Sequence, residues 1–164
     1  MTPDERAALI ERYAAGPARL RAAVSEAPEE MRHWRPEPGE FSVHEIALHC
    51  ADSEANAHMR IRYLLAEDAP VLAGYDADRW ATTLAYAARP LGPALAVVDA
   101  VRANTVPLLR LAGDADWARS GTHTESGPYS AEDWLRIYAA HCHEHAEQVE
   151  RVVAAWRAQA GERD

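Results

Sequence analysis

The chain has 164 residues, which fits one domain spanning residues 1–164 and is long enough to bury a sizeable core. It contains 26 Asp and Glu residues against 17 Lys and Arg residues, for a formal net charge of -9, and the arginines are scattered along the sequence. We therefore expect no nucleic-acid partner, and no secretory signal or membrane span because no long apolar run occurs; a cytoplasmic location follows. Alanine and leucine are abundant and phenylalanine occurs once, which favours helices over sheet.

The first helix is expected to begin at Thr2-Pro3-Asp4-Glu5, where a threonine N-cap and a glutamate form a capping box around a proline at the first helical position. Apolar residues such as Leu9, Tyr13 and Leu20 follow at helical spacing. Gly16-Pro17 interrupts this pattern, and we expect it to kink or briefly break the helix.

A proline-rich connection, Pro36-Glu37-Pro38-Gly39, leads into a second capping box at Ser42-Val43-His44-Glu45. The apolar stripe that follows predicts a second helix over about 42–67. A loop over 68–74 and a short helix near 78–88 are expected next.

Two more long helices complete the pattern. One is expected over about 92–112, with a kink at Pro107, and the last over about 130–160, beginning at the capping box Ser130-Ala-Glu-Asp133. Between them, 116–129 is expected to be irregular and is long enough to carry function. Four long helices without a strand pattern predict an all-α four-helix bundle with a short extra helix between helices 2 and 3.

The last helix carries His141 and His145, four residues apart. Positions at this spacing lie roughly 40° apart around an α-helix, so both imidazoles project from one face. That face is otherwise apolar, with Trp134, Tyr138 and Val149 on it, so the rings should point into the core. A metal ion shared by both rings would satisfy their nitrogens, and the alternative is a pair of ordinary core or surface histidines.

A catalytic metal needs a third protein ligand, and His49 on the inward stripe of the second helix is the best candidate. His143 is turned about 200° from His141, and His58 lies off the face of His49. Three neutral nitrogens suit Zn²⁺ or Ni²⁺ and leave a coordination position open for chemistry.

The two cysteines, Cys50 and Cys142, are too few for a disulfide framework. Each directly follows a candidate histidine ligand, which raises the alternative of a Cys/His zinc site. A neighbour in sequence is turned about 100° away on a helix, so the two side chains should not reach one ion. We expect both cysteines to be small buried packing residues.

Several motifs together resemble the DinB/YfiT-like family over nearly the whole chain. They include Trp34-Arg-Pro-Glu-Pro-Gly, His49-Cys-Ala-Asp52-Ser53, the loop His123-x-Glu125-Ser-Gly127, and His141-x-x-x-His145. The resemblance implies a bundle with up-down-down-up connectivity, a homodimer, and a three-histidine metal site whose ligands match His49, His141 and His145. It also implies a metal-dependent hydrolase or a thiol S-transferase of the bacillithiol or mycothiol type.

The chain departs from that pattern at two positions. Relatives often have a histidine where this chain has Glu144, just before the second ligand of the last helix, and another where it has Glu54. The spacing makes neither position a ligand, so we expect the metal site to survive and the substrate pocket to differ.

We expect the open metal position to bind a low-molecular-weight thiol such as bacillithiol and to favour its ionisation for attack on an electrophile, as in an S-transferase. One alternative is a hydrolase that uses a metal-bound hydroxide. Another is a non-enzymatic bundle, stabilised by metal, that acts as a binding or stress protein. A small-molecule substrate is expected for the two enzymatic hypotheses.

Six further residues are candidates for supporting roles. Asp52 or Glu45 could accept the free N–H of His49, Tyr138 could donate to a bound anion, and Glu144 could accept a proton. The candidates for catalysis are Asp52, Tyr138 and Glu144. The candidates for lining the pocket or binding the cosubstrate are His123, Tyr75 and Arg60.

Overall fold

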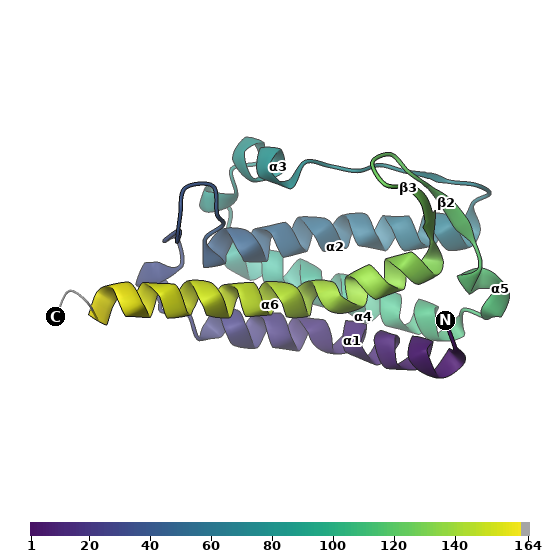
Figure 1. The fold of residues 1–164 in the computed structure, drawn as a ribbon, viewed down its shortest axis with the longest axis horizontal. Helices are drawn as coiled ribbons and strands as arrows, with labels where there is room; N and C mark the ends of the chain where they lie inside the picture. Colours follow the sequence, from purple (N-terminus) through teal and green to yellow (C-terminus); the bar gives the residue numbers. More distant parts are fainter. Residues whose placement is uncertain (162–164) are drawn as a thin grey trace.

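The computed structural model describes residues 1–161 and shows a bundle of four long helices (Figure 1). These are α1 (Pro3–Ser25), α2 (Val43–Ala66), α4 (Leu91–Leu111) and α6 (Ala131–Gly161). Helices α1 and α6 run in one direction, and α2 and α4 run in the opposite direction. This confirms the predicted four-helix bundle with up-down-down-up connectivity.

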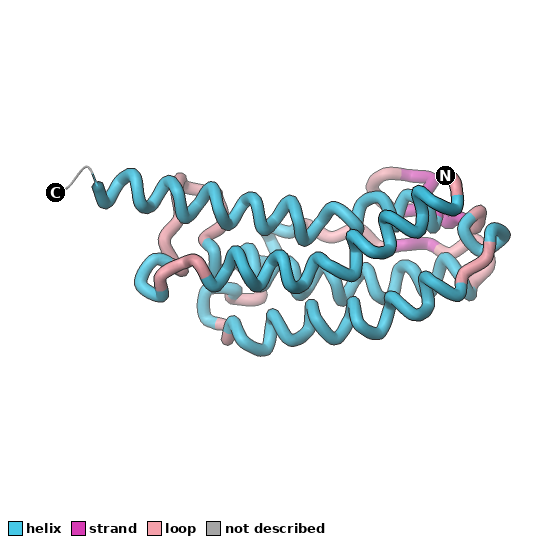
Figure 2. The backbone as a smooth tube through the Cα atoms, turned by 90° about the horizontal axis from the view of Figure 1, so that it is seen from below, coloured by secondary structure: helices cyan, strands magenta, loops and turns pink. Residues whose placement is uncertain are grey.

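The packing of the helices follows from this connectivity. Helix α1 packs against α6 and α4, and α2 packs against α4 and α6, so that α1 and α2 lie diagonally across the bundle. Figure 2 shows the same helices side by side from below. Since α2 and α4 run in the same direction, the chain between them must return along the length of the bundle, and it does so over α2 (Figure 1).

Short helices occupy the connections. They are η1 (Glu29–Met31), α3 (Ala77–Thr83), η2 (Tyr86–Ala88) and α5 (Asp114–Trp117). Helix α3 is the extra helix predicted between the second and third long helices. It ends earlier than expected because Ala85 adopts a left-handed conformation, with φ of 50°, which no α-helix can continue through.

A small sheet corrects the prediction that 116–129 is irregular. Strands β1 (Val71–Leu72), β2 (Ser120–His123) and β3 (Gly127–Ser130) lie in the order β1-β2-β3. Strand β2 pairs with β1 in parallel and with β3 in antiparallel fashion. Strands of four residues or fewer, containing glycine and proline, are too short to show an alternating pattern. The hairpin ties the chain after α2 to the start of α6.

The three predicted capping boxes form. The Thr2 and Ser42 side chains each accept a hydrogen bond from the backbone N–H of the glutamate three positions on, and that glutamate's carboxylate accepts one from the backbone N–H of the cap residue. At the start of α6, the Asp133 N–H donates to Ser130 Oγ at 3.1 Å and the Ser130 N–H donates to Asp133 Oδ2 at 3.0 Å. None of the helices within residues 1–161 combines the length and apolarity needed to cross a membrane.

A kink or a brief break was expected at Gly16-Pro17; the break is wrong, because α1 continues through both residues, and the kink stays a prediction. Gly16 is buried where α1 meets α4 and α6, and a Cβ atom at this position would overlap the Arg102 guanidinium and lie 2.9 Å from the Cys142 Cβ. Packing of α1 against both neighbours therefore outweighs the local effect of the proline.

Gly16→Ala is expected to destabilise the protein by about 1–3 kcal/mol, because overpacking at the Arg102 guanidinium outweighs the better helix propensity of alanine. Gly92→Ala is the matched control, since it lies in the first turn of α4 and a Cβ there has no neighbour within 4 Å in the part of the chain described. Urea denaturation of the two variants measures the difference. Equal or higher stability of Gly16→Ala would contradict the packing assigned to this position.

Candidate metal centre

The structure brings the three predicted ligands together. His49 lies on α2, and His141 and His145 lie one turn apart on α6. One side-chain nitrogen from each lies within 4.8 Å of the other two. The ring centroid of His145 lies 4.8 Å from that of His49 and 4.6 Å from that of His141. These distances bring the three imidazoles within reach of one ion.

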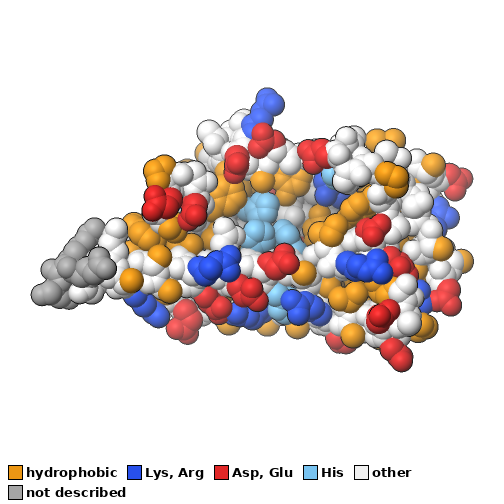
Figure 3. Space-filling view, in the orientation of Figure 1, with side chains coloured by type: hydrophobic (Ala, Val, Ile, Leu, Met, Phe, Trp, Pro, Cys, Tyr) orange, Lys and Arg blue, Asp and Glu red, His pale blue; other side chains and the backbone are white. Residues whose placement is uncertain are grey.

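The three imidazoles are partly exposed to solvent. Figure 3 shows histidine side chains at the floor of a hollow in one face of the molecule. All three ligand candidates have intermediate exposure, and the His141 side chain is 13% exposed. A metal ion held there would keep a side open to an exchangeable ligand, as catalytic sites require.

The protonation states of His49 and His145 suit metal binding. Burial and the neighbouring His141 lower the pKa of His49 to about 4. Burial, His141 and His49 lower the pKa of His145 to about 3. Both rings are therefore neutral at pH 7, and a neutral imidazole is the form that binds a metal.

The hydrogen bonding of these two rings also fits a metal ion. The Nδ1 atom of His145 lies 2.8 Å from Gln148 Oε1, which leaves Nε2 available as a ligand atom. The Nδ1 atom of His49 is buried and has no hydrogen-bond partner among residues 1–161. A buried polar nitrogen without a partner is unfavourable, and the residues present therefore fit a divalent cation.

His141 differs from the other two. Burial by itself lowers its pKa, but Cys142 and the Glu54 carboxylate outweigh burial and raise the pKa to about 9. In the metal-free protein this ring is therefore protonated at neutral pH, and a metal ion must displace its proton.

We expect the apparent affinity for Zn²⁺ to rise by about tenfold per pH unit between pH 6 and pH 8. The proton on His141 competes with the metal below pH 9, whereas His49 and His145, with pKa values of about 4 and 3, are already neutral in this range. Chelator competition at several pH values measures the slope. An affinity that does not change over this range would show that no ligand is protonated in the metal-free protein.

Glu54 lies beside the candidate metal centre, and the sequence did not predict this position for it. Its carboxylate is fully buried, and Oε1 lies 2.5 Å from Arg102 Nη2 and 3.6 Å from His141 Nδ1. Burial raises the pKa of Glu54, but His141 and Arg102 together hold it below its ordinary value. The feature of the sequence that could have pointed to Glu54 was Arg102. This arginine lies one turn after Val98 on the otherwise apolar stripe of α4.

Glu54, His141 and Cys142 form a second group of metal-ligand type, with donor atoms within 4.8 Å of one another. Adjacent residues His141 and Cys142 thus approach a common point, which corrects the expectation that they cannot. The Arg102 guanidinium already neutralises Glu54 from this side, so a divalent cation would meet a buried positive charge. The prediction that Cys50 and Cys142 are buried is confirmed.

The three residues predicted for catalysis lie in different surroundings. Asp52 pairs with Arg89 at 2.9 Å, and Glu45 caps α2 and pairs with Arg35. Neither carboxylate hydrogen-bonds to Nδ1 of His49, which corrects the tautomer role suggested for them. Tyr138 is buried, with its ring centroid 5.6 Å from that of His141, and its hydroxyl accepts from Arg60 Nη1 at 3.1 Å.

Glu144 lies on α6 between the two ligands and is exposed. Its proposed role as a proton acceptor stays a prediction, as does the role of Tyr138 as a donor to a bound anion.

The three predicted pocket residues lie on three different segments: Arg60 on α2, His123 on β2, and Tyr75 between β1 and α3. The Arg60 guanidinium lies 5.9 Å from the Tyr75 ring centroid and also donates to the Ala73 carbonyl at 2.5 Å. Arg60 forms no ion pair with a carboxylate within residues 1–161. His123 is buried on β2 beside Tyr129, with ring centroids 5.6 Å apart.

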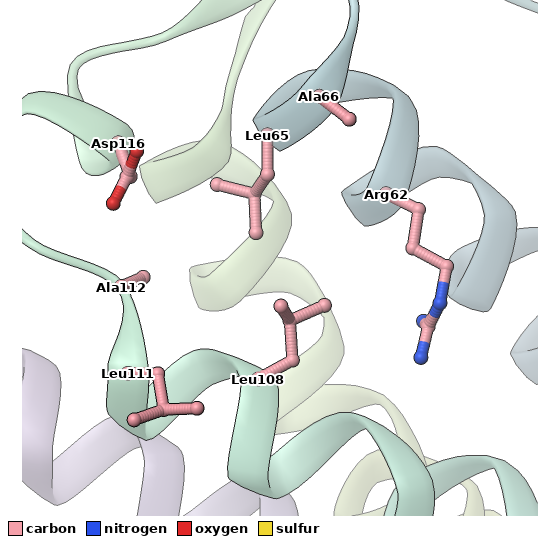
Figure 4. Close-up of a pocket in the computed structure, with 7 residues that line it drawn as sticks. All are labelled: Arg62, Leu65, Ala66, Leu108, Leu111, Ala112 and Asp116. Atoms are coloured by element: carbon pink, nitrogen blue, oxygen red, sulfur yellow. The ribbon is translucent and has the colours of Figure 1, made fainter.

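A separate cavity of about 310 Å³ lies between the ends of α2 and α4 (Figure 4). Leu65, Leu108 and Leu111 supply much of its apolar lining, and Arg62 and Asp116 are its charged residues. Its lining includes none of the three histidines, so this cavity is distinct from the candidate metal centre.

The fold and the site define the class of protein: a four-helix bundle with a candidate three-histidine metal centre. The family comparison identifies it more closely. The family model described as the DinB superfamily matches residues 12–149, and the chain belongs to this superfamily.

Relatives and a solved structure extend this result. A protein of Oceanobacillus iheyensis, named "Putative metal-dependent hydrolase", is 30% identical over 129 residues, which cover 79% of this chain and 74% of the relative. YfiT of Bacillus subtilis, with the same descriptive name, is 28% identical over 131 residues, covering 79% of this chain and 73% of YfiT. A structure of Bacillus subtilis YfiT superposes with a TM-score of 0.86 and 22% identity, covering 93% of this chain and 87% of that chain.

Proposed function

We propose that this protein is a metal-dependent S-transferase that joins a low-molecular-weight thiol of the bacillithiol type to an electrophile. The observation that carries the proposal is the convergence of His49, His141 and His145 in a partly exposed hollow. These residues would hold Zn²⁺ or Ni²⁺, both of which accept three imidazole ligands. When bound, the metal ion supplies an open position that favours ionisation of a thiol.

The surroundings of the three histidines favour an acidic cosubstrate. Arg60 reaches the Tyr138 hydroxyl, beside the ring of His141, and has no carboxylate partner in the part of the chain that the structure describes. It can therefore pair with a carboxylate on the thiol, and Tyr75 beneath it can pack against the same molecule. The buried Tyr138 can donate to an anion at the same place.

Arg60→Gln is expected to raise the KM for an acidic thiol about tenfold or more while changing the KM for the uncharged 2-mercaptoethanol by less than about threefold. The loss of one charge-assisted hydrogen bond accounts for this difference. Arg62→Gln is the matched control, because the Arg62 side chain turns toward Asn104 and Thr105. Equal effects on both thiols would show that Arg60 does not recognise the acidic group.

A second candidate function is a metal-dependent hydrolase, which the names of the relatives favour. The test is to incubate the zinc- or nickel-loaded protein with a thiol and monochlorobimane, and separately with p-nitrophenyl esters without thiol. Thiol-dependent conjugation supports the transferase, and ester turnover without thiol supports the hydrolase. Inactivity in both, with metal bound, would leave a metal-stabilised binding or stress protein. The expected homodimer stays a prediction that sedimentation can test.

A further inference from the structure

The Glu54 carboxylate lies behind the three histidines, on the side away from the hollow. Its Oε1 atom is 3.6 Å from Nδ1 of His141, and the carboxylate is fully buried. That Nδ1 atom is itself buried and has no hydrogen-bond partner in the region from residue 1 to residue 161. When His141 binds an ion through Nε2, Nδ1 carries a proton and needs an acceptor, and Glu54 is the carboxylate that faces it.

Contacts on its far side hold Glu54 in this position. Arg102 Nη2 donates to Oε1 at 2.5 Å, and the Tyr13 hydroxyl donates to Oε2 at 3.4 Å. Arg102 is in turn fixed by hydrogen bonds to the Tyr13 carbonyl at 2.6 Å and the Tyr138 carbonyl at 2.9 Å. Gly16 leaves the space that this guanidinium occupies. The carboxylate therefore accepts hydrogen bonds from groups on α1 and α4, and the guanidinium that holds it is itself anchored to α1 and α6.

A buried ion pair is a poor source of stability, because removing both charges from water costs about as much as their attraction returns. Arg102 and Glu54 are 1% and 0% exposed, so this cost applies in full. The pair nevertheless lies directly against a candidate metal ligand, where a fixed carboxylate has a specific use: it selects the tautomer and the orientation of the imidazole.

We propose that Glu54 is a positioning residue of the metal centre, which accepts the Nδ1–H of His141 and thereby directs Nε2 toward the ion, with Arg102 holding the carboxylate in place. The proposal rests on the proposed metal-dependent function. It gives Glu54 a role at the metal centre, whereas the family resemblance predicted only that the substrate pocket would differ at this position.

The test compares Glu54→Gln with Glu45→Gln by chelator competition for Zn²⁺ and by the absorption spectrum of the Co²⁺-loaded protein. Both are buried glutamates of α2 that pair with an arginine, but the Glu45 carboxylate hydrogen-bonds to Arg35 and to Ser42 at the N-terminal cap, and within residues 1–161 it forms no hydrogen bond or ion pair with the three histidines. Glu54→Gln is expected to weaken Zn²⁺ binding about 10–100-fold and to shift the Co²⁺ spectrum. Glu45→Gln is expected to lower the unfolding temperature while leaving affinity and spectrum unchanged.

Glu54→Asp serves as a second variant in case Glu54→Gln fails to fold. It keeps the charge but withdraws the carboxylate by one methylene, and it is expected to weaken Zn²⁺ binding less than glutamine does while still shifting the Co²⁺ spectrum. Wild-type affinity and spectrum in a folded Glu54 variant would overturn the role of Glu54 and leave the proposed function intact. Equal weakening in Glu45→Gln would also overturn it, and a wild-type protein without metal affinity would remove both proposals.

Discussion

Replacing His141 with alanine is expected to weaken Zn²⁺ binding by at least about 100-fold, because a three-ligand centre loses one ligand and the two that remain cannot hold a catalytic metal tightly. The ring of His141 lies close to both other imidazoles, with centroids 4.6 Å from His145 and 5.6 Å from His49. Metal content after purification and chelator competition measure the loss. We also expect Zn²⁺ to raise the unfolding temperature of the wild-type protein and not that of the variant.

His143→Ala is the matched control for this experiment. It removes an imidazole from the same helix two residues away, where the ring points toward the Arg12 carbonyl at 2.9 Å. The control is expected to bind Zn²⁺ like the wild type. Metal content that is unchanged in His141→Ala, or lowered equally in both variants, would contradict the assignment of His141 as a ligand.

Arg102→Met is expected to destabilise the protein by about 3–5 kcal/mol, the largest effect on stability that we predict for a single substitution. The variant removes the positive charge beside Glu54 and leaves that carboxylate buried in the bundle without its partner, since the two side chains are 1% and 0% exposed. Two further hydrogen bonds of the guanidinium are also lost, because the Tyr13 carbonyl on α1 and the Tyr138 carbonyl on α6 lose their donor. Urea denaturation of the metal-free protein at pH 7 measures the change.

Arg110→Met provides the control on the same helix. Arg110 pairs with Glu11 at the surface, with side chains 54% and 65% exposed, and its loss is expected to cost less than about 1 kcal/mol. The double variant Glu54→Leu/Arg102→Met should recover most of the stability, because an apolar pair leaves no unpaired charge. A small effect of Arg102→Met alone would show that Glu54 takes up a proton or reaches water when its partner is removed.

The helices could be predicted because their signals are local. Thr2 and Ser42 each carry a capping box that is complete within four residues, and the spacing of His141 and His145 fixes their common face from helix geometry alone. His49 could be chosen as the third ligand because it lies on the apolar stripe of α2, and this stripe had to face the same core as His141 and His145. These features need no knowledge of which helices are neighbours.

The features that were missed depend on contacts between distant segments. The Glu54–Arg102 pair joins residues 48 positions apart, and it exists only because α2 and α4 are neighbours and Gly16 on α1 leaves room. Likewise, β2 pairs with a two-residue strand that precedes it by almost fifty positions, so no local pattern could predict this pairing. Gly16-Pro17 was expected to kink or briefly break α1, but the helix continues through both residues where it packs against α4 and α6.

The most direct test of the metal centre is an anomalous difference map from crystals soaked in Zn²⁺, collected on both sides of the zinc absorption edge. We expect one peak in the hollow, about 2.0–2.1 Å from a ring nitrogen of each of His49, His141 and His145. No peak at this position, or a peak placed instead between Glu54, His141 and Cys142, would contradict it.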